Sequence, residues 1–378
     1  MNTPASTTEI IREVKFNDAS EITKLLRGLG LAMPATPKSI EAHWRRLWID
    51  NPAVIATGNS LPLGWVLEKE GNIVGLFCNL LRLYYLGGRQ VIVAGASQWG
   101  LEKRHRAKIR QLADAYFEQE GVDVLMATTA NVSAGRILER YGALRIPQPE
   151  YDQIYYWVLD GPGFIGAALN KKLNHPGLIS WVQKLIGPFA GMGQFMVRKF
   201  FFSTSGEVSH IGVNEIGAEF DDLWNTKFAE ADKFLACRSS DSLRWHFGSV
   251  GDAKEARVFV HRQERLRGYM VVMRDDVEDI KLKRLRIADL FVEDDDAAVV
   301  ANLLCAAYDY GRQQGYHSLE WIGMSSKLRD VALRHRPLVR KLPTWPLYYK
   351  GLTAEIADAL QGSEPWYITF YDGDTTLA

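Results

Sequence analysis

The first 160 residues contain two hydrophobic periodicities, one typical of strands and one typical of helices. Residues 10–16 alternate between apolar and polar positions, as a half-buried strand does. The three- and four-residue spacing of a buried helix face occurs in Ile109, Leu112, Ala113, Tyr116 and Phe117. The expected strands are 10–16, 64–69, 73–85, 90–99, 122–127 and 153–159. Helices are expected between the first two strands, over 18–29 and 38–48, and again after the fourth and fifth strands. Asn131 is expected to cap the last of these helices, and Gly142 to end it.

From residue 207 onward the same order of strands and helices begins again. Landmarks in the two halves correspond at a nearly constant offset of about 193 residues, as repeated units do. The matched pairs are Gly75 with Gly268, Leu101 with Val292, Gly121 with Gly315, and Tyr155 with Tyr348. The sequence therefore predicts two copies of one unit, over 1–160 and 207–378.

The segment between the copies, 161–206, has a different composition. It is rich in Gly, Phe and Met, and it contains no acidic residue between Asp160 and Glu207. We interpret it as a basic, apolar helical linker packed between two domains, with helices expected around 164–173 and 178–186. Basic amphipathic segments also cover apolar ligands or lie on membrane surfaces, so peripheral membrane contact through 163–202 stays open.

Composition limits the classes of function. The 378 residues carry 45 basic and 45 acidic side chains, and this balance argues against broad nucleic-acid binding, which needs a basic surface. Cys78, Cys237 and Cys305 are widely spaced in apolar runs, as buried thiols of a reducing compartment are, and have no zinc-site spacing. No signal peptide or membrane-spanning run is evident, so a cytoplasmic location is expected. No metal is expected, because the isolated histidines resemble packing partners.

The turn before the predicted helix at 109 has an unusual charge. Its basic residues are Lys103, Arg104, Arg106, Lys108 and Arg110. Cations are unfavourable beside the positive end of a helix dipole, so the pattern predicts an external anion there, although a solvated basic face is the alternative. At the same place the second copy carries the acidic run 293–296. That run would repel a diphosphate.

Each copy has the order β-α-α-β-β-β-α-β-α-β-β, and in this it resembles the GCN5-related N-acetyltransferase (GNAT) superfamily. The fold class expected is α/β, with two GNAT-like domains in tandem, each a mixed, mostly antiparallel sheet flanked by helices. In that family a V-x-P-x-Y-R-G-x-G-type turn holds the pyrophosphate of acetyl-CoA, and residues 101–109 fall in its register. A later N-x-x-A-x-x-x-Y-x-x-x-G motif is matched by Asn131, Ala134 and Gly142.

The resemblance implies acetyl-CoA or another acyl-CoA as co-substrate. The implied cofactor-binding residues are Trp99, Leu101, Arg104, His105, Arg106, Ala107, Lys108, Ile109, Asn131 and Ala134. The backbone amides of 104–109 would hold the diphosphate, and Asn131 would contact the pantetheine. The chain departs from the family motifs where Lys103 replaces Pro, where Ala107 and Ile109 replace Gly, and where Leu138 replaces the frequent general-acid tyrosine. Tyr141 lies three residues later, so it does not inherit that role.

Acyl transfer also needs a proton acceptor for the attacking amine. Glu102 is a candidate by position and His105 by chemistry, although both are equally typical of a solvated or phosphate-side residue.

The predicted function is an acyl-CoA-dependent N-acyltransferase acting on an amine of a small molecule or sugar, as a monomer or homodimer. Only the first copy is expected to bind CoA, with the second shaping the acceptor site. A non-catalytic protein that keeps the fold, and a FemX-like aminoacyl transferase, are the alternatives. Asp372 and Asp374 either form a turn or bind a cationic or hydroxylated substrate.

Overall fold

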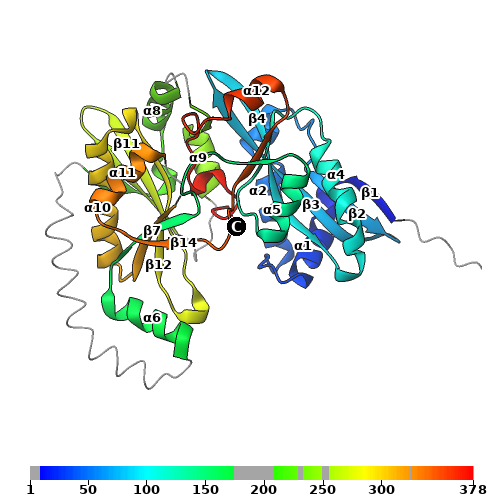
Figure 1. Ribbon diagram of the computed structural model, residues 1–378, viewed down its shortest axis with the longest axis horizontal. Helices are drawn as coiled ribbons and strands as arrows, with labels where there is room; N and C mark the ends of the chain where they lie inside the picture. The colour runs from blue at the N-terminus through cyan, green and yellow to red at the C-terminus, as the bar shows by residue number, and fades with distance from the viewer. Residues whose placement is uncertain (1–8, 174–207, 229–232, 249–254, 323–324, 378) are drawn as a thin grey trace, which may run out of the picture. The chain divides into compact units, whose positions relative to one another are not determined.

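The computed structural model describes residues 9–173, 208–228, 233–248, 255–322 and 325–377 (Figure 1). The chain divides into two compact units. The first unit consists of Met1–Ile146 and Pro346–Gly362, and the second consists of Pro147–Trp345 and Ser363–Ala378. Most of the segment expected as a linker, including a helix expected at 178–186, lies outside the described residues. Its beginning forms helix α6, Gly161–Leu173.

The first unit contains a mixed sheet with the strand order β1-β2-β3-β4-β5-β15-β6. Its strands are β1 Glu9–Glu13, β2 Gly64–Lys69, β3 Asn72–Leu86, β4 Arg89–Leu101, β5 Val124–Ala127, β15 Tyr348–Gly351 and β6 Leu144–Arg145. Along this path β4 and β5 are parallel, and every other neighbouring pair is antiparallel.

Helices flank this sheet, and their ends follow the polar residues that cap them. They are α1 Ala19–Gly28, α2 Pro37–Trp48, α3 Pro52–Ala56, α4 Ile109–Phe117, α5 Val132–Arg140 and α12 Ala354–Ala359, with 3-10 turns η1 Phe16–Asp18 and η2 Lys103–Lys108. The Thr36 hydroxyl accepts from the Ser39 N–H at the start of α2. Trp44 and Trp48 of α2 are buried and stacked at 4.2 Å, and Trp44 Nε1 donates to Thr23 of α1 over 2.8 Å.

The second unit repeats this plan with the strand order β14-β7-β13-β12-β11-β10-β8. Its strands are β8 Val208–Ile211, β10 Ala256–Arg262, β11 Leu266–Arg274, β12 Arg284–Val292, β13 Ser318–Ile322, β7 Gln153–Val158 and β14 Leu338–Lys341, and a short strand β9 spans Leu235–Ala236. Its helices, besides α6, are α8 Ala218–Phe228, α9 Ser240–Phe247, α10 Ala297–Gln313 and α11 Ser326–Arg334. Short 3-10 turns are η3 Val213–Glu215, η5 Glu278–Ile280, η6 Glu293–Asp295 and η7 Phe370–Asp372. Two mixed sheets flanked by helices confirm the predicted fold class.

The two halves of the chain exchange one strand each. The sequence placed 153–159 at the end of the first copy, but β7 pairs with β13 and β14 in the second sheet. In return, β15 pairs with β5 and β6 in the first sheet. The unit boundaries therefore differ from the expected division at 160 and 207. The physical reason is that Tyr155 and Tyr348 lie in matching apolar strands, so the sequence pattern of each suits either sheet.

None of the helices in the described part of the chain has the length and apolar character needed to cross a membrane. Across the same residues, no group of three or more His, Cys, Asp or Glu side chains is arranged to hold a metal ion.

Candidate functional site

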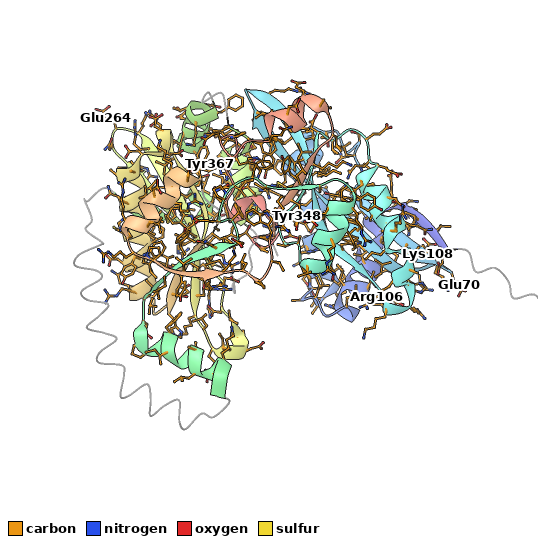
Figure 2. The ribbon with its side chains drawn as sticks, in the orientation of Figure 1. Glu70, Arg106, Lys108, Glu264, Tyr348 and Tyr367 are labelled. Atoms are coloured by element: carbon orange, nitrogen blue, oxygen red, sulfur yellow. The ribbon has the colours of Figure 1, made fainter. Side chains whose placement is uncertain are left out.

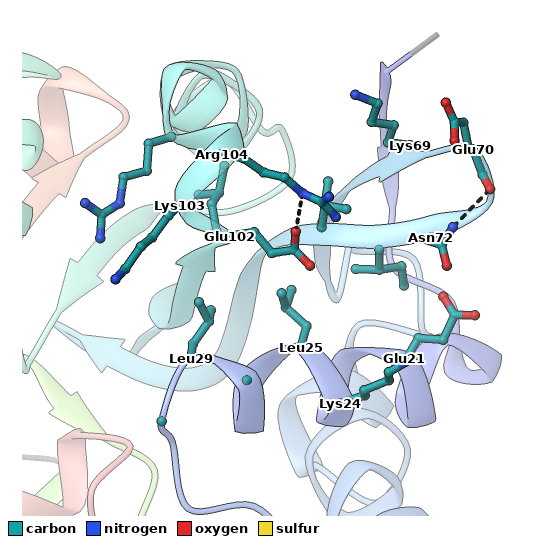
Figure 3. Close-up of a pocket in the computed structure, with 16 residues that line it drawn as sticks. Glu21, Lys24, Leu25, Leu29, Lys69, Glu70, Asn72, Glu102, Lys103 and Arg104 are labelled. Carbon is teal, nitrogen blue, oxygen red and sulfur yellow. Dashed lines mark hydrogen bonds and ion pairs between the residues drawn. The ribbon is translucent and has the colours of Figure 1, made fainter. Parts of the chain in front are cut away.

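A cavity of about 1110 Å³ lies beside the basic turn of the first unit (Figure 3). Three elements enclose it, namely the second half of α1, the hairpin between β2 and β3, and the turn that follows β4. Its lining residues are Glu21, Lys24, Leu25, Gly28, Leu29, Gly30, Lys69, Glu70, Asn72, Ile73, Val74, Leu101, Glu102, Lys103, Arg104 and Arg106. Figure 3 shows Leu25 of α1 and Leu29, which follows this helix, facing the turn residues across the cavity.

The turn itself is a tight 3-10 helix. The Glu102 N–H donates to the Val74 carbonyl over 3.0 Å, which fixes the end of β4 against β3. The His105 N–H donates to the Glu102 carbonyl, and the Ile109 N–H donates to the Arg106 carbonyl. Two of the amides expected to face a diphosphate are therefore already used inside the chain. Side-chain cations have to supply a larger share of any anion binding here than glycine-rich turns require.

The side-chain charges of the turn are only partly compensated. Arg104 Nε donates to Glu102 over 2.8 Å, drawn as a dashed line in Figure 3. Lys103 and Arg106 form no ion pair or hydrogen bond with the residues that the structure describes. Figure 2 places Arg106, Lys108 and Glu70 at the same end of the first unit. The cavity lining carries five cationic and three acidic side chains, so its net charge is positive.

His105 is buried and is not one of the lining residues. Its Nδ1 lies 3.0 Å from Glu9 Oε1, which ties the turn to β1. Desolvation acts to raise the pKa of Glu9, but Lys69, His105 and Lys108 lower it overall. Of the two catalytic candidates, Glu102 lines the cavity and His105 does not. His105 holds the turn in place.

On the side of β4 that faces β5, no strand pairing is described beyond Gly95. The described pairing of β4 with β5 covers only Val93–Gly95, and an extra residue in β4 opposite Phe77 makes a bulge at which Gln98 has φ of 46°. Trp99 stacks on Phe77 at a ring separation of 4.5 Å. Trp99 Nε1 and Gln98 Oε1 are buried without a hydrogen-bond partner in the described part of the chain. Buried polar atoms without a partner are costly, and a bound amide-rich ligand would satisfy them.

Ala107, Lys108 and Ile109 of the turn do not line the cavity, and neither do Asn131 and Ala134 at the start of α5. Asn131 Oδ1 accepts from the Ala134 N–H over 3.0 Å, which confirms that Asn131 caps the helix. Leu138 is buried. Tyr141 donates to Asp114 and stacks on Phe117 at 4.3 Å, so it joins α5 to α4. Burial and the Asp114 carboxylate raise the pKa of Tyr141 to about 12.

In the matching turn of the second unit, acidic side chains form ion pairs with basic residues of the same unit. Asp295 accepts from Lys227 Nζ over 2.7 Å, and this lysine, fully buried, also donates to the Val292 carbonyl over 2.9 Å. Glu293 pairs with both Arg265 and Arg267. The sequence analysis missed Lys227. The signal was present, because Lys227 shares one helix stripe with Phe220, Leu223 and Trp224.

The C-terminal aspartate is also part of the interior. Asp372 is buried, accepts from the Thr369 N–H over 2.7 Å and lies 3.4 Å from Arg238. Arg238 pairs in turn with Asp289 at 3.0 Å. Of the two interpretations of Asp372, the structure favours the turn.

Comparison with known proteins gives a fold and no close relative. No family model matches the sequence, and no curated protein matches it. Among solved structures, the chain is similar to a GCN5-related N-acetyltransferase from Anabaena variabilis, with 10% identity, a TM-score of 0.59, and coverage of 92% of this chain and 73% of that one. It is also similar to a probable N-acyltransferase of unknown function from Enterococcus faecalis, with 10% identity, a TM-score of 0.58, and coverage of 93% and 74%.

A third similar structure is Eis1 from Mycobacterium abscessus, with 13% identity, a TM-score of 0.52, and coverage of 93% of this chain and 76% of that one. At these identities the likeness is one of fold. The chain has the GNAT fold in tandem, as the sequence pattern predicted.

Proposed function

We propose that this chain is an acyl-CoA-dependent N-acyltransferase that moves an acyl group, acetyl in the simplest case, to an amine of a small molecule or sugar. One observation carries the proposal. The same turn occurs in both units, and it is compensated by internal partners in the second, whereas in the first Lys103 and Arg106 lie beside a large cavity without a partner among the residues that the structure describes. Unpaired cations beside a cavity suit a diphosphate.

The remaining groups fit the other parts of acyl-CoA. Gln98 Oε1 and Trp99 Nε1 of β4, which have no hydrogen-bond partner among the described residues, suit an amide-containing pantetheine arm. Asn131, at the start of α5, would contact the same arm. Lys103 and Arg106 would hold the diphosphate, with Arg104 adjacent to them.

The proposed reaction is a direct displacement. The amine nitrogen attacks the thioester carbonyl carbon, so a C–N bond forms as the C–S bond breaks. The amine gives up one proton, and the departing CoA sulfur takes one up, so the products are an amide and free CoA. Glu102 is the proposed proton acceptor because it lines the cavity, and His105 is proposed as a positioning residue that acts through Glu9.

Calorimetry with CoA tests the site. Wild-type protein is expected to bind CoA, and Arg106→Glu is expected to weaken binding about tenfold or more, because a charge-assisted contact contributes about 1.5–3 kcal/mol. Lys38→Glu is the matched control, since it makes the same charge reversal on an exposed residue of the first unit outside the cavity. Absence of binding by the wild type, or equal binding by Arg106→Glu, would refute the proposed site.

Thiol release tests the chemistry. The protein is incubated with acetyl-CoA and a panel of primary amines that includes amino sugars, and free CoA is followed with a thiol reagent. Turnover is expected to be lost in Arg106→Glu and strongly reduced in Glu102→Gln. CoA binding without thiol release for any amine would instead support the non-catalytic alternative.

A further inference from the structure

The second unit contains a cluster of charged side chains on one face of its sheet. We define the arginine cluster as Arg284, Arg286, Arg340, Asp275 and Glu320. Arg286 of β12 lies directly opposite Glu320 of β13 in the parallel register, so the two side chains share a face. Asp275 accepts from Arg284 at 2.5 Å and pairs with Arg286 at 2.6 Å. Glu320 accepts from Arg340 at 3.0 Å and from Arg284 at 3.2 Å.

The fold does not require these charges. In the first unit the corresponding pairs of the parallel strands are Val93 with Val124 and Gly95 with Met126. In the second unit the same two pairs are Arg284 with Ser318 and Arg286 with Glu320. One copy therefore builds this part of the sheet from apolar residues alone. Placing charges on a half-buried strand face costs free energy, so their presence in the other copy calls for another explanation.

The cluster is not balanced internally. It holds three guanidinium groups against two carboxylates. Arg286 is only 15% exposed, and its guanidinium lies over the Phe370 ring at 4.4 Å. Its Nε is buried without a hydrogen-bond partner in the described residues. Burial lowers the pKa of Arg286 to about 10, and the neighbouring carboxylates of Asp275 and Glu320 offset this only in part.

A stacked arginine is well prepared to bind an oxyanion. Its planar guanidinium presents N–H donors in a fixed geometry that matches a carboxylate or a phosphate, and stacking restricts its side-chain rotation. Arg340 is 41% exposed and uses a single described contact, to Glu320. It can therefore reach a ligand from solvent, whereas Arg286 supplies the ordered and less hydrated part of the cluster.

We propose that the arginine cluster of the second unit is a binding site for an oxyanion, namely a carboxylate or phosphate group of a small ligand, with Arg286 and Arg340 as its donors. The site is separate from the cavity of the first unit, and the proposal does not rest on acyl transfer.

The test uses the full chain carrying Arg106→Glu, which removes the anion site proposed in the first unit. Thermal unfolding is followed during titration with inorganic phosphate and, separately, with citrate, each at constant ionic strength set by NaCl. A saturable rise in Tm is expected for one of the two anions. The apparent affinity should fall about tenfold or more with Arg286→Ala, and Arg286→Lys should restore part of it.

Arg257→Ala is the matched control, because Arg257 is another half-buried arginine of the second unit with one described carboxylate partner and lies outside the cluster. It should leave the titration unchanged. Should Arg286→Ala fail to fold, Arg340→Ala replaces it, since that side chain is more exposed than Arg286. A direct readout is the Nε–H resonance of Arg286 in 15N-arginine-labelled protein, which should shift with the same midpoint.

The outcomes separate clearly. A response to phosphate alone assigns the site to phosphorylated ligands, and a response to citrate alone assigns it to carboxylates. No response beyond that of NaCl, or the same response in Arg286→Ala and Arg340→Ala, would overturn the proposal and leave the cluster as an internal ion-pair network.

Discussion

At the scale of single residues, the buried cation Lys227 compensates part of the negative charge of the turn after β12. Lys227 has no exposed surface, and it compensates Asp295 while capping the end of β12. Its counterpart turn in the first unit is rich in cations, and the described part of the chain provides no such partner for Lys103 or Arg106. The two turns thus carry opposite charges at matched positions. In the second unit these charges are compensated by other residues of the chain, and in the first unit the described residues leave two of them available to a ligand.

Lys227→Met is expected to destabilise the protein by about 3–5 kcal/mol, because it leaves Asp295 as an unpaired buried charge. Denaturant unfolding followed by circular dichroism measures the loss. The double variant with Asp295→Asn removes the stranded charge, so it should recover a substantial part of the stability. A double variant no more stable than Lys227→Met would argue that packing of the lysine stem matters more than its charge.

His43 gives the protein a pH dependence. Burial, with a smaller effect of Arg46, lowers the pKa of His43 to about 4 from an ordinary value near 6.5. Below pH 6.5, His43 therefore takes up a proton in the unfolded chain but stays neutral in the folded chain. Its contribution to the free energy of unfolding is fully present above pH 6.5 and is lost as the pH falls toward 4. Urea unfolding at several pH values should show this decline, and His43→Leu should flatten it. An unchanged slope would assign the acid sensitivity to other groups.

At the scale of elements, helix ends were the most predictable features. Asn131 and Gly142 were expected to begin and end a helix, and α5 follows Asn131 and ends just before Gly142, whose φ is +78°. Both are local effects, since a capping oxygen and a left-handed backbone depend on residues close in sequence. Lys227 was not foreseen, because its partner Asp295 is distant in sequence and only the folded sheet brings the two together.

Asn131→Ala is expected to cost about 1 kcal/mol of stability, since the Ala134 N–H loses its acceptor. Asn131→Asp keeps the capping oxygen and should be close to wild type in the same denaturant experiment. CoA affinity measured on both variants then isolates the proposed pantetheine contact. Equal stability of Asn131→Ala and wild type would show that solvent replaces the cap without cost.

At the scale of the whole molecule, the strand exchange is the feature that the sequence analysis did not anticipate. Periodicity identified 153–159 correctly as a strand, but it carries no information about which of two similar sheets the strand joins. In the folded protein, β15 packs specifically against the first unit. A Cβ added at Gly135 of α5 would lie 2.7 Å from the Tyr348 hydroxyl, so β15 fits closely beneath that helix.

A fragment limited to residues 1–160 is expected not to fold cooperatively, because β5 and β6 lose the strand between them. Joining residues 346–362 to residue 146 through a flexible linker supplies β15 and should restore a cooperative thermal transition. Circular dichroism and a proton–nitrogen NMR spectrum distinguish the two. A well-dispersed spectrum from 1–160 alone would contradict the expectation.

The same exchange has a consequence for how the protein is made. β6 ends at Arg145 and β15 begins at Tyr348, so roughly 200 residues must leave the ribosome before the first sheet can close. At about 5–20 residues per second this takes on the order of 10–40 s. Throughout that interval the nascent chain exposes an unpaired β5 edge, which makes it a natural client for ribosome-associated chaperones and makes any premature stop before residue 348 a loss of both units.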